Sequence, residues 1–72
     1  LKIKAMAVLK VIELLSSSPK SWEDAAGEAV KTAAKTIKAI RSVYIQDMSA
    51  IVNENKITEF RVNVKITFEV LE

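Results

Sequence analysis

The most regular pattern in the chain is a strict alternation of apolar and polar residues from Glu59 to Val70. A period of two residues predicts a β-strand with one apolar face, because successive side chains of a strand point to opposite sides. At about 3.3 Å per residue this strand would be about 40 Å long, well beyond the usual length. One helix cannot cover a sheet of that length, so we expect the chain to assemble with partners. The apolar positions are Phe60, Val62, Val64, Ile66, Phe68 and Val70.

A single helix is predicted to begin at Ser21. Ser21 is a favourable N-cap residue, and Asp24 occupies a position like that of a capping box. Together with Glu23, Asp24 also suits the positive end of the helix dipole. The apolar residues that follow are spaced by three and four, as expected of one buried stripe. Because most of them are alanine, the helix can lie unusually close to the sheet. The stripe consists of Trp22, Ala25, Ala26, Ala29, Val30, Ala33, Ile37 and Ile40.

A first strand is predicted between Ala7 and Leu15, where Lys10 and Glu13 are the only charges among many valines, leucines and isoleucines. This density of apolar residues suits a strand with much of both faces covered. We expect the strand to end in a turn at residues 16–19, because serines favour turns and proline cannot donate to a strand ladder.

A further strand is predicted between Arg41 and Val52, followed by a polar turn at residues 53–56. The predicted fold is therefore α+β, in the order β-α-β-β, with a three-stranded antiparallel sheet packed on one helix. The alternation in this strand is imperfect. Its two faces carry Val43 and Ile45 on one side, and Ser42, Tyr44 and Gln46 on the other.

The composition supports the expectation of assembly. The 72 residues include no cysteine and no histidine, so disulfides are impossible and a structural zinc site is not expected. A chain of this size buries only about 60% of its unfolded surface, which leaves its own core marginal. Association with further copies is the remaining source of stability.

The formal charge of +2 includes two lysines ahead of Met6. We expect residues 1–5 to be an N-terminal extension or a remnant that precedes a natural start at Met6, and residues 6–72 to form a single domain. Without those lysines the charges balance, so the basicity is a weak argument for nucleic acid or an anionic membrane. No apolar run is long enough to span a bilayer and no signal peptide is recognised, so we expect a cytoplasmic protein.

The residues offer little catalytic chemistry, and we expect no enzymatic activity. Without histidine the commonest general base is missing, and the serines at 16–18 have no activating partner nearby. The neighbouring carboxylates Glu23 and Asp24 are explained by the helix start. The basic residues Lys31, Lys35 and Lys38 are interpreted as a solvated face at the helix C-terminus, and no nucleic-acid-binding pattern accompanies them.

Two residues on the second predicted strand are candidates for ligand contacts. Asp47 stands alone, so one chain is not expected to hold a metal, but a symmetry axis could bring several copies of this carboxylate together. Tyr44 could stack on a flat ligand, although packing on the sheet explains it as well.

The order of several segments resembles the dodecin family, whose small β-α-β-β subunits assemble into hollow dodecamers of cubic symmetry. The resemblance extends from about Val8 to Val70, and depends on the order and spacing of the segments rather than on any single motif. The segments are Lys10–Leu14, Ser18–Ala25, Ala33–Ile37, Phe60–Val62 and Phe68–Val70.

The best-known members of this family hold stacked flavins between subunits without using them in catalysis. The resemblance places Ser42 where those members have a flavin-stacking tryptophan, and Arg61 where they have a glutamine that binds the ring edge. The family's glycine before the helix is replaced by Ser16. Serine cannot supply the stacking energy, whereas arginine can bind ring carbonyls or stack through its guanidinium plane, so flavin binding is weakened rather than excluded.

A second branch of the family, associated with calcium, is similar to this chain at the same two positions and around Asp47. The resemblance therefore implies a non-enzymatic homododecamer that binds or stores a small ligand. The ligand could be riboflavin or FMN, with Ser42, Tyr44 and Arg61 at a retuned site. Calcium or another cation held by Asp47 is the alternative, as is a purely structural shell with no flavin.

Overall fold

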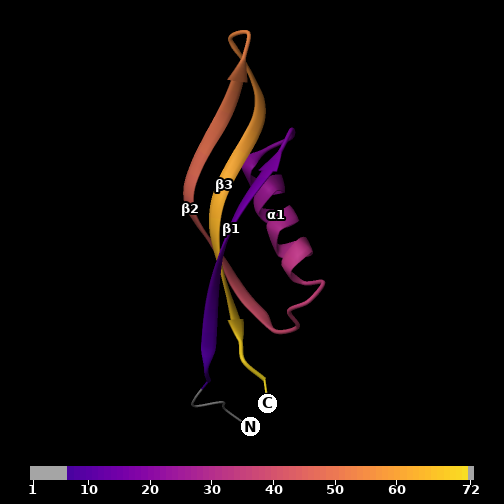
Figure 1. The fold of residues 1–72 in the computed structure, drawn as a ribbon, viewed down its shortest axis with the longest axis vertical. Helices are drawn as coiled ribbons and strands as arrows, with labels where there is room; N and C mark the ends of the chain where they lie inside the picture. The colour runs from indigo at the N-terminus through magenta and orange to yellow at the C-terminus, as the bar shows by residue number, and fades with distance from the viewer. Residues whose placement is uncertain (1–6, 72) are drawn as a thin grey trace.

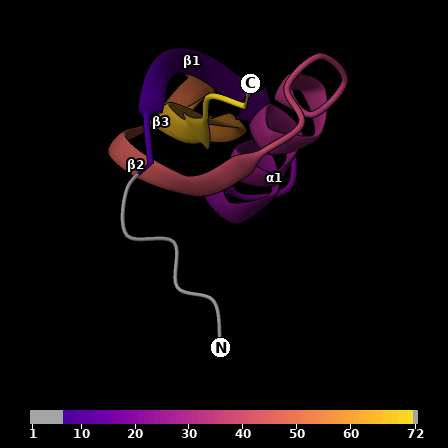
Figure 2. The ribbon, with the colours of Figure 1, turned by 90° about the horizontal axis from the view of Figure 1, so that it is seen from below.

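A computed structural model of the chain describes residues 7–71, so the expected extension at residues 1–5 lies outside the described part. The elements follow in the predicted order β-α-β-β. They form one antiparallel sheet in the order β1-β3-β2, and α1 packs against one face of it (Figures 1 and 2). The elements are β1 (Leu9–Ser18), α1 (Trp22–Ala33), β2 (Ile40–Asn53) and β3 (Lys56–Glu69).

The turn predicted at residues 16–19 begins later than expected, because the serines belong to β1. Ser16, Ser17 and Ser18 pair with Val62, Arg61 and Phe60 of β3. Pairing along the long central strand thus overrides the turn preference of serine. Ser18 is also buried, and its hydroxyl donates to Asp24 Oδ2 at 2.6 Å while accepting from the Lys20 amide at 2.9 Å.

The helix begins where it is predicted to begin and ends earlier. The Asp24 amide donates to the Ser21 hydroxyl at 2.9 Å, which confirms Ser21 as the N-cap. The last helical residue is Ala33, although the apolar stripe continues through Ile37 to Ile40. Ile37 still packs on the core from the loop that follows, and Ile40 does so from the first position of β2. The spacing of the apolar residues therefore identifies core-facing residues even after the helix has ended.

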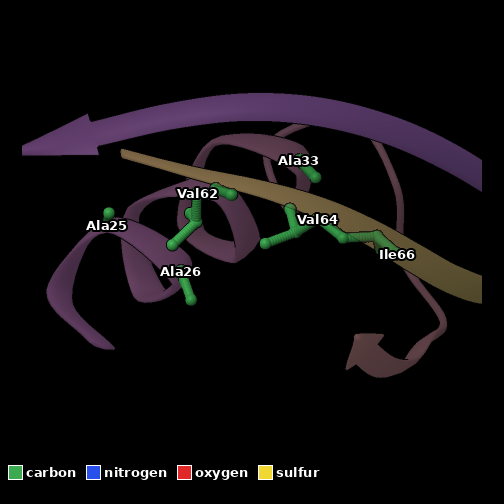
Figure 3. Close-up of a cluster of buried hydrophobic side chains, with 7 residues drawn as sticks. Ala25, Ala26, Ala33, Val62, Val64 and Ile66 are labelled. Atoms are coloured by element: carbon green, nitrogen blue, oxygen red, sulfur yellow. The ribbon is translucent and has the colours of Figure 1, made fainter. Parts of the chain in front are cut away.

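The core is a thin layer between the alanine face of α1 and the central strand β3. The fully buried residues of the helix are all alanines, with the larger Trp22 and Val30 partly buried beside them, whereas β3 contributes large branched side chains that point toward the helix (Figure 3). The small residues allow the close approach that their spacing predicts. The buried core residues are Ala25, Ala26, Ala29, Ala33, Val62, Val64 and Ile66.

Gly27 is exposed in the middle of α1, where a stabilising substitution is available. A Cβ added at this position would meet nothing within 4 Å. Alanine has the higher helix propensity, so Gly27→Ala is expected to raise the free energy of unfolding by about 1 kcal/mol. Urea denaturation of the variant and the unaltered chain measures this difference. No gain, or a loss, would show that the exposed surface of α1 is covered by a contact that an added methyl group disturbs.

Among residues 7–71, no element covers the face of the sheet opposite α1. We call this surface the open face. It exposes apolar side chains of β1, including Val11 at 57% and Leu15 at 82%. The expectation that β1 is largely covered on both faces is therefore not met by a single chain. The β2–β3 hairpin also extends well past α1 (Figure 1), since a helix of 12 residues is only about 18 Å long.

Candidate functional site

The strand register arranges the side chains of the open face in rows that cross all three strands. One row joins Leu15 of β1, Asn63 of β3 and Asp47 of β2. The next row joins Ser17, Arg61 and Ser49 in the same strand order. Adjacent rows are two residues apart, about 7 Å along the strands.

An irregularity in β2 places Asp47 on this face. Tyr44 pairs with Lys65 and Asp47 pairs with Asn63, so three residues of β2 advance against two of β3. This register shift lies between Ile45 and Asp47 and is the signature of a β-bulge. Strict alternation would place Gln46 on the same face as Tyr44. Because of the bulge, the next residue on that face is Asp47 instead.

A pocket of about 360 Å³ lies over these two rows. It combines one guanidinium and one carboxylate with serine hydroxyls and an amide, next to the apolar side chain of Leu15. Arg61 and Asp47, both predicted as site residues, therefore line the same pocket. The lining residues are Leu15, Ser16, Ser17, Asp47, Ser49, Arg61, Val62 and Asn63.

Asn63, one of the lining residues, carries a buried and unsatisfied acceptor. Its side-chain oxygen Oδ1 is buried and has no hydrogen-bond partner in the described part of the chain. A buried acceptor without a partner costs about 1–3 kcal/mol, so a ligand that donates a hydrogen bond or coordinates this oxygen would recover that energy. Asp47 is the direct register partner of Asn63 on β2, so an amide and a carboxylate residue are cross-strand neighbours.

The other two predicted site residues lie on the open face but outside the pocket. Tyr44 is in the row of Lys65, and Ser42 is in the row of Thr67. The rows of Ser42 and Arg61 are six positions apart on β3, a distance of about 20 Å along the strand. One chain therefore does not bring Ser42 and Arg61 together, and a flavin site using both would combine different copies. Tyr44 is 64% exposed, so within one chain it is not packed into the sheet.

The first turn of α1 supports the strands beneath the pocket. The indole N–H of Trp22 donates to the Ser49 carbonyl of β2 at 2.8 Å. The same ring packs edge-to-face on Phe60 of β3, with ring centroids 4.8 Å apart and an interplanar angle of 76°. Trp22 therefore connects α1 to the pocket residue Ser49 and to Phe60, which directly precedes the pocket residue Arg61.

The pocket also contains residues that the sequence did not single out as site residues. Ser17, Ser49 and Asn63 have no motif around them. The pairing of β1 and β2 with β3 places Ser17 and Ser49 beside Arg61, and Asn63 beside Asp47. Within residues 7–71 no group of three or more acidic residues could hold a metal ion. None of the helices described is long and apolar enough to cross a bilayer.

Comparisons with known proteins agree with this architecture. The family model "Dodecin" matches residues 8–71. The calcium dodecin of Mycobacterium tuberculosis is 41% identical over 66 residues, covering 89% of this chain and 90% of that protein. Its crystal structure, with a calcium-binding site, has a TM-score of 0.78 at 33% identity over 90% of this chain and 93% of that chain. A dodecin structure from Streptomyces coelicolor has a TM-score of 0.89 at 19% identity, covering 96% of this chain and 99% of that chain. This chain belongs to the dodecin family.

Proposed function

We propose that this protein is a non-enzymatic, homododecameric protein that binds or stores a small ligand. The observation that carries this proposal is the pocket that joins Asp47, Asn63 and Arg61 on the open face. Its hydroxyls have no imidazole or thiol beside them, which suits binding rather than acid–base chemistry. Assembly is supported by the uncovered apolar side chains of β1 and by the family to which the chain belongs.

Calcium is the ligand that the pocket favours most. Ca²⁺ binds carboxylate and amide oxygens, and Asp47 and Asn63 present one of each in adjacent positions. The buried Asn63 Oδ1 lacks a hydrogen-bond partner among the described residues, so coordination of an ion would satisfy it. Ca²⁺ takes about six to eight oxygen ligands, so further copies or water would complete the set. The relative with 41% identity is itself named a calcium dodecin.

A calorimetric titration with calcium chloride tests this assignment. We expect the unaltered protein to bind Ca²⁺ and Asp47→Asn to bind it at least tenfold more weakly, because the substitution removes the carboxylate charge while keeping the size of the side chain. Glu28→Gln removes a carboxylate from the exposed surface of α1 and serves as the matched control. Equal affinities for Asp47→Asn and the unaltered protein, or no binding by the unaltered protein, would contradict the calcium site.

Flavin is the second candidate ligand, favoured by the exposed ring of Tyr44 and by Arg61 in the pocket. A flavin bound between copies could contact the row of Ser42 on one copy and Arg61 on another. Riboflavin fluorescence during titration with the protein distinguishes the two ligands. Quenching at micromolar protein supports flavin binding, and unquenched fluorescence contradicts it.

A further inference from the structure

The Arg61 row of the pocket has the composition of an anion site. Ser17 and Ser49 pair with Arg61 from the two sides, and all three residues line the pocket. A guanidinium offers N–H donors in a planar fork that matches phosphate oxygens, and each serine hydroxyl can donate one further hydrogen bond. From this arrangement we infer that Arg61, Ser17 and Ser49 bind a phosphate-type oxyanion. The inference rests on the proposed ligand-binding function and names the anionic part of the ligand.

The donors of Arg61 are available for such a ligand. Within residues 7–71 Arg61 makes no ion pair with Asp47, although both line the pocket. Arg41 provides the contrast, because its guanidinium is engaged by the buried carboxylate of Glu69 at 2.9 Å. Arg41 therefore has a structural partner within the chain, whereas Arg61 presents its charge to the pocket.

The negative charge of Asp47 should weaken phosphate binding, whereas the positive charge of Arg61 should strengthen it. Its carboxylate lies in the next row, about 7 Å along the strands, and repels an anion bound at Arg61. Neutralising Asp47 should therefore strengthen phosphate binding. A bound calcium ion would do this in the assembled protein, and Asp47→Asn does it without any metal.

Calorimetric titration with inorganic phosphate in calcium-free buffer tests the inference on the assembled protein. We expect the unaltered protein to bind phosphate, Arg61→Gln to bind it at least tenfold more weakly, and Asp47→Asn to bind it severalfold more tightly. The matched control is Lys65→Gln, which removes a positive charge from the same strand and the same face outside the pocket. We expect its affinity to stay within twofold of the unaltered protein.

Three results would overturn the inference: no phosphate binding by the unaltered protein, unchanged binding by Arg61→Gln, or an equal loss in Lys65→Gln. If Arg61→Gln fails to fold or assemble, Arg61→Lys decides, because it keeps the charge and removes the planar fork. An intermediate affinity for Arg61→Lys supports the site, and full affinity contradicts a role for the fork. Since no calcium is present, failure of the calcium assignment leaves this test intact.

Discussion

Replacing Ile66 by alanine is expected to lower the free energy of unfolding by about 2–5 kcal/mol. Ile66 is fully buried in the central strand, among the largest side chains of the core. The fully buried helix residues of the same cluster are alanines, whose methyl groups are too short to fill the space that the lost side chain leaves. Because a domain of this size is stabilised by roughly 4–11 kcal/mol, the variant would lose a large share of its stability.

Urea denaturation at one fixed protein concentration measures this effect, and Ile57→Ala is the matched control. Ile57 lies on the same strand but is 54% exposed near the hairpin turn. The same change of side chain there should cost less than about 1 kcal/mol, because little apolar area is removed from the core. Equal losses of unfolding free energy at both positions would show that the hairpin contributes as much to stability as the packing between α1 and β3.

Replacing Val11 by lysine is expected to prevent assembly while leaving the subunit folded. Val11 lies on the open face of β1, outside the pocket, and is 57% exposed in the single chain. A lysine there is tolerated by one subunit in water. In an interface it would place a charge where an apolar surface is covered, at a cost of several kcal/mol.

Sedimentation velocity compares this variant with Thr32→Lys, which introduces the same side chain on the exposed surface of α1. We expect Val11→Lys to sediment as a small species and Thr32→Lys to remain assembled. Circular dichroism should show the same secondary structure for both variants. An assembled Val11→Lys variant would mean that the open face of β1 is not an interface between copies.

The sequence patterns predicted those features that depend on neighbouring residues. The alternation around Ile66 defined β3 and its core face, and Ser21 was the expected N-cap. The patterns failed where distant segments decide the outcome. Ser16 and Ser17 favour a turn locally, yet they extend β1 because β3 is long enough to pair with them.

The candidate site was likewise predicted only in part, because residues from distant segments form it. Arg61 and Asp47 were both identified, and their meeting in one pocket depends on the strand order and on the bulge before Asp47. The alternation places Asn63 on the face of Arg61, and Ser49 on the face of Asp47. Neither the register between the strands nor the bulge has a sequence motif here, so the pocket that these residues share could not be assigned in advance. Ser42 and Arg61, grouped by the family resemblance, lie on rows far apart in one chain.

The central claim is that this chain is the subunit of a homododecameric, ligand-binding shell rather than a protein that remains a single chain in solution. Multi-angle light scattering of the unaltered protein tests it most directly. Twelve copies of a chain of 8.0 kDa predict a particle of about 96 kDa that stays intact on dilution. A single species near 8.0 kDa, folded and stable at the same concentration, would contradict the account.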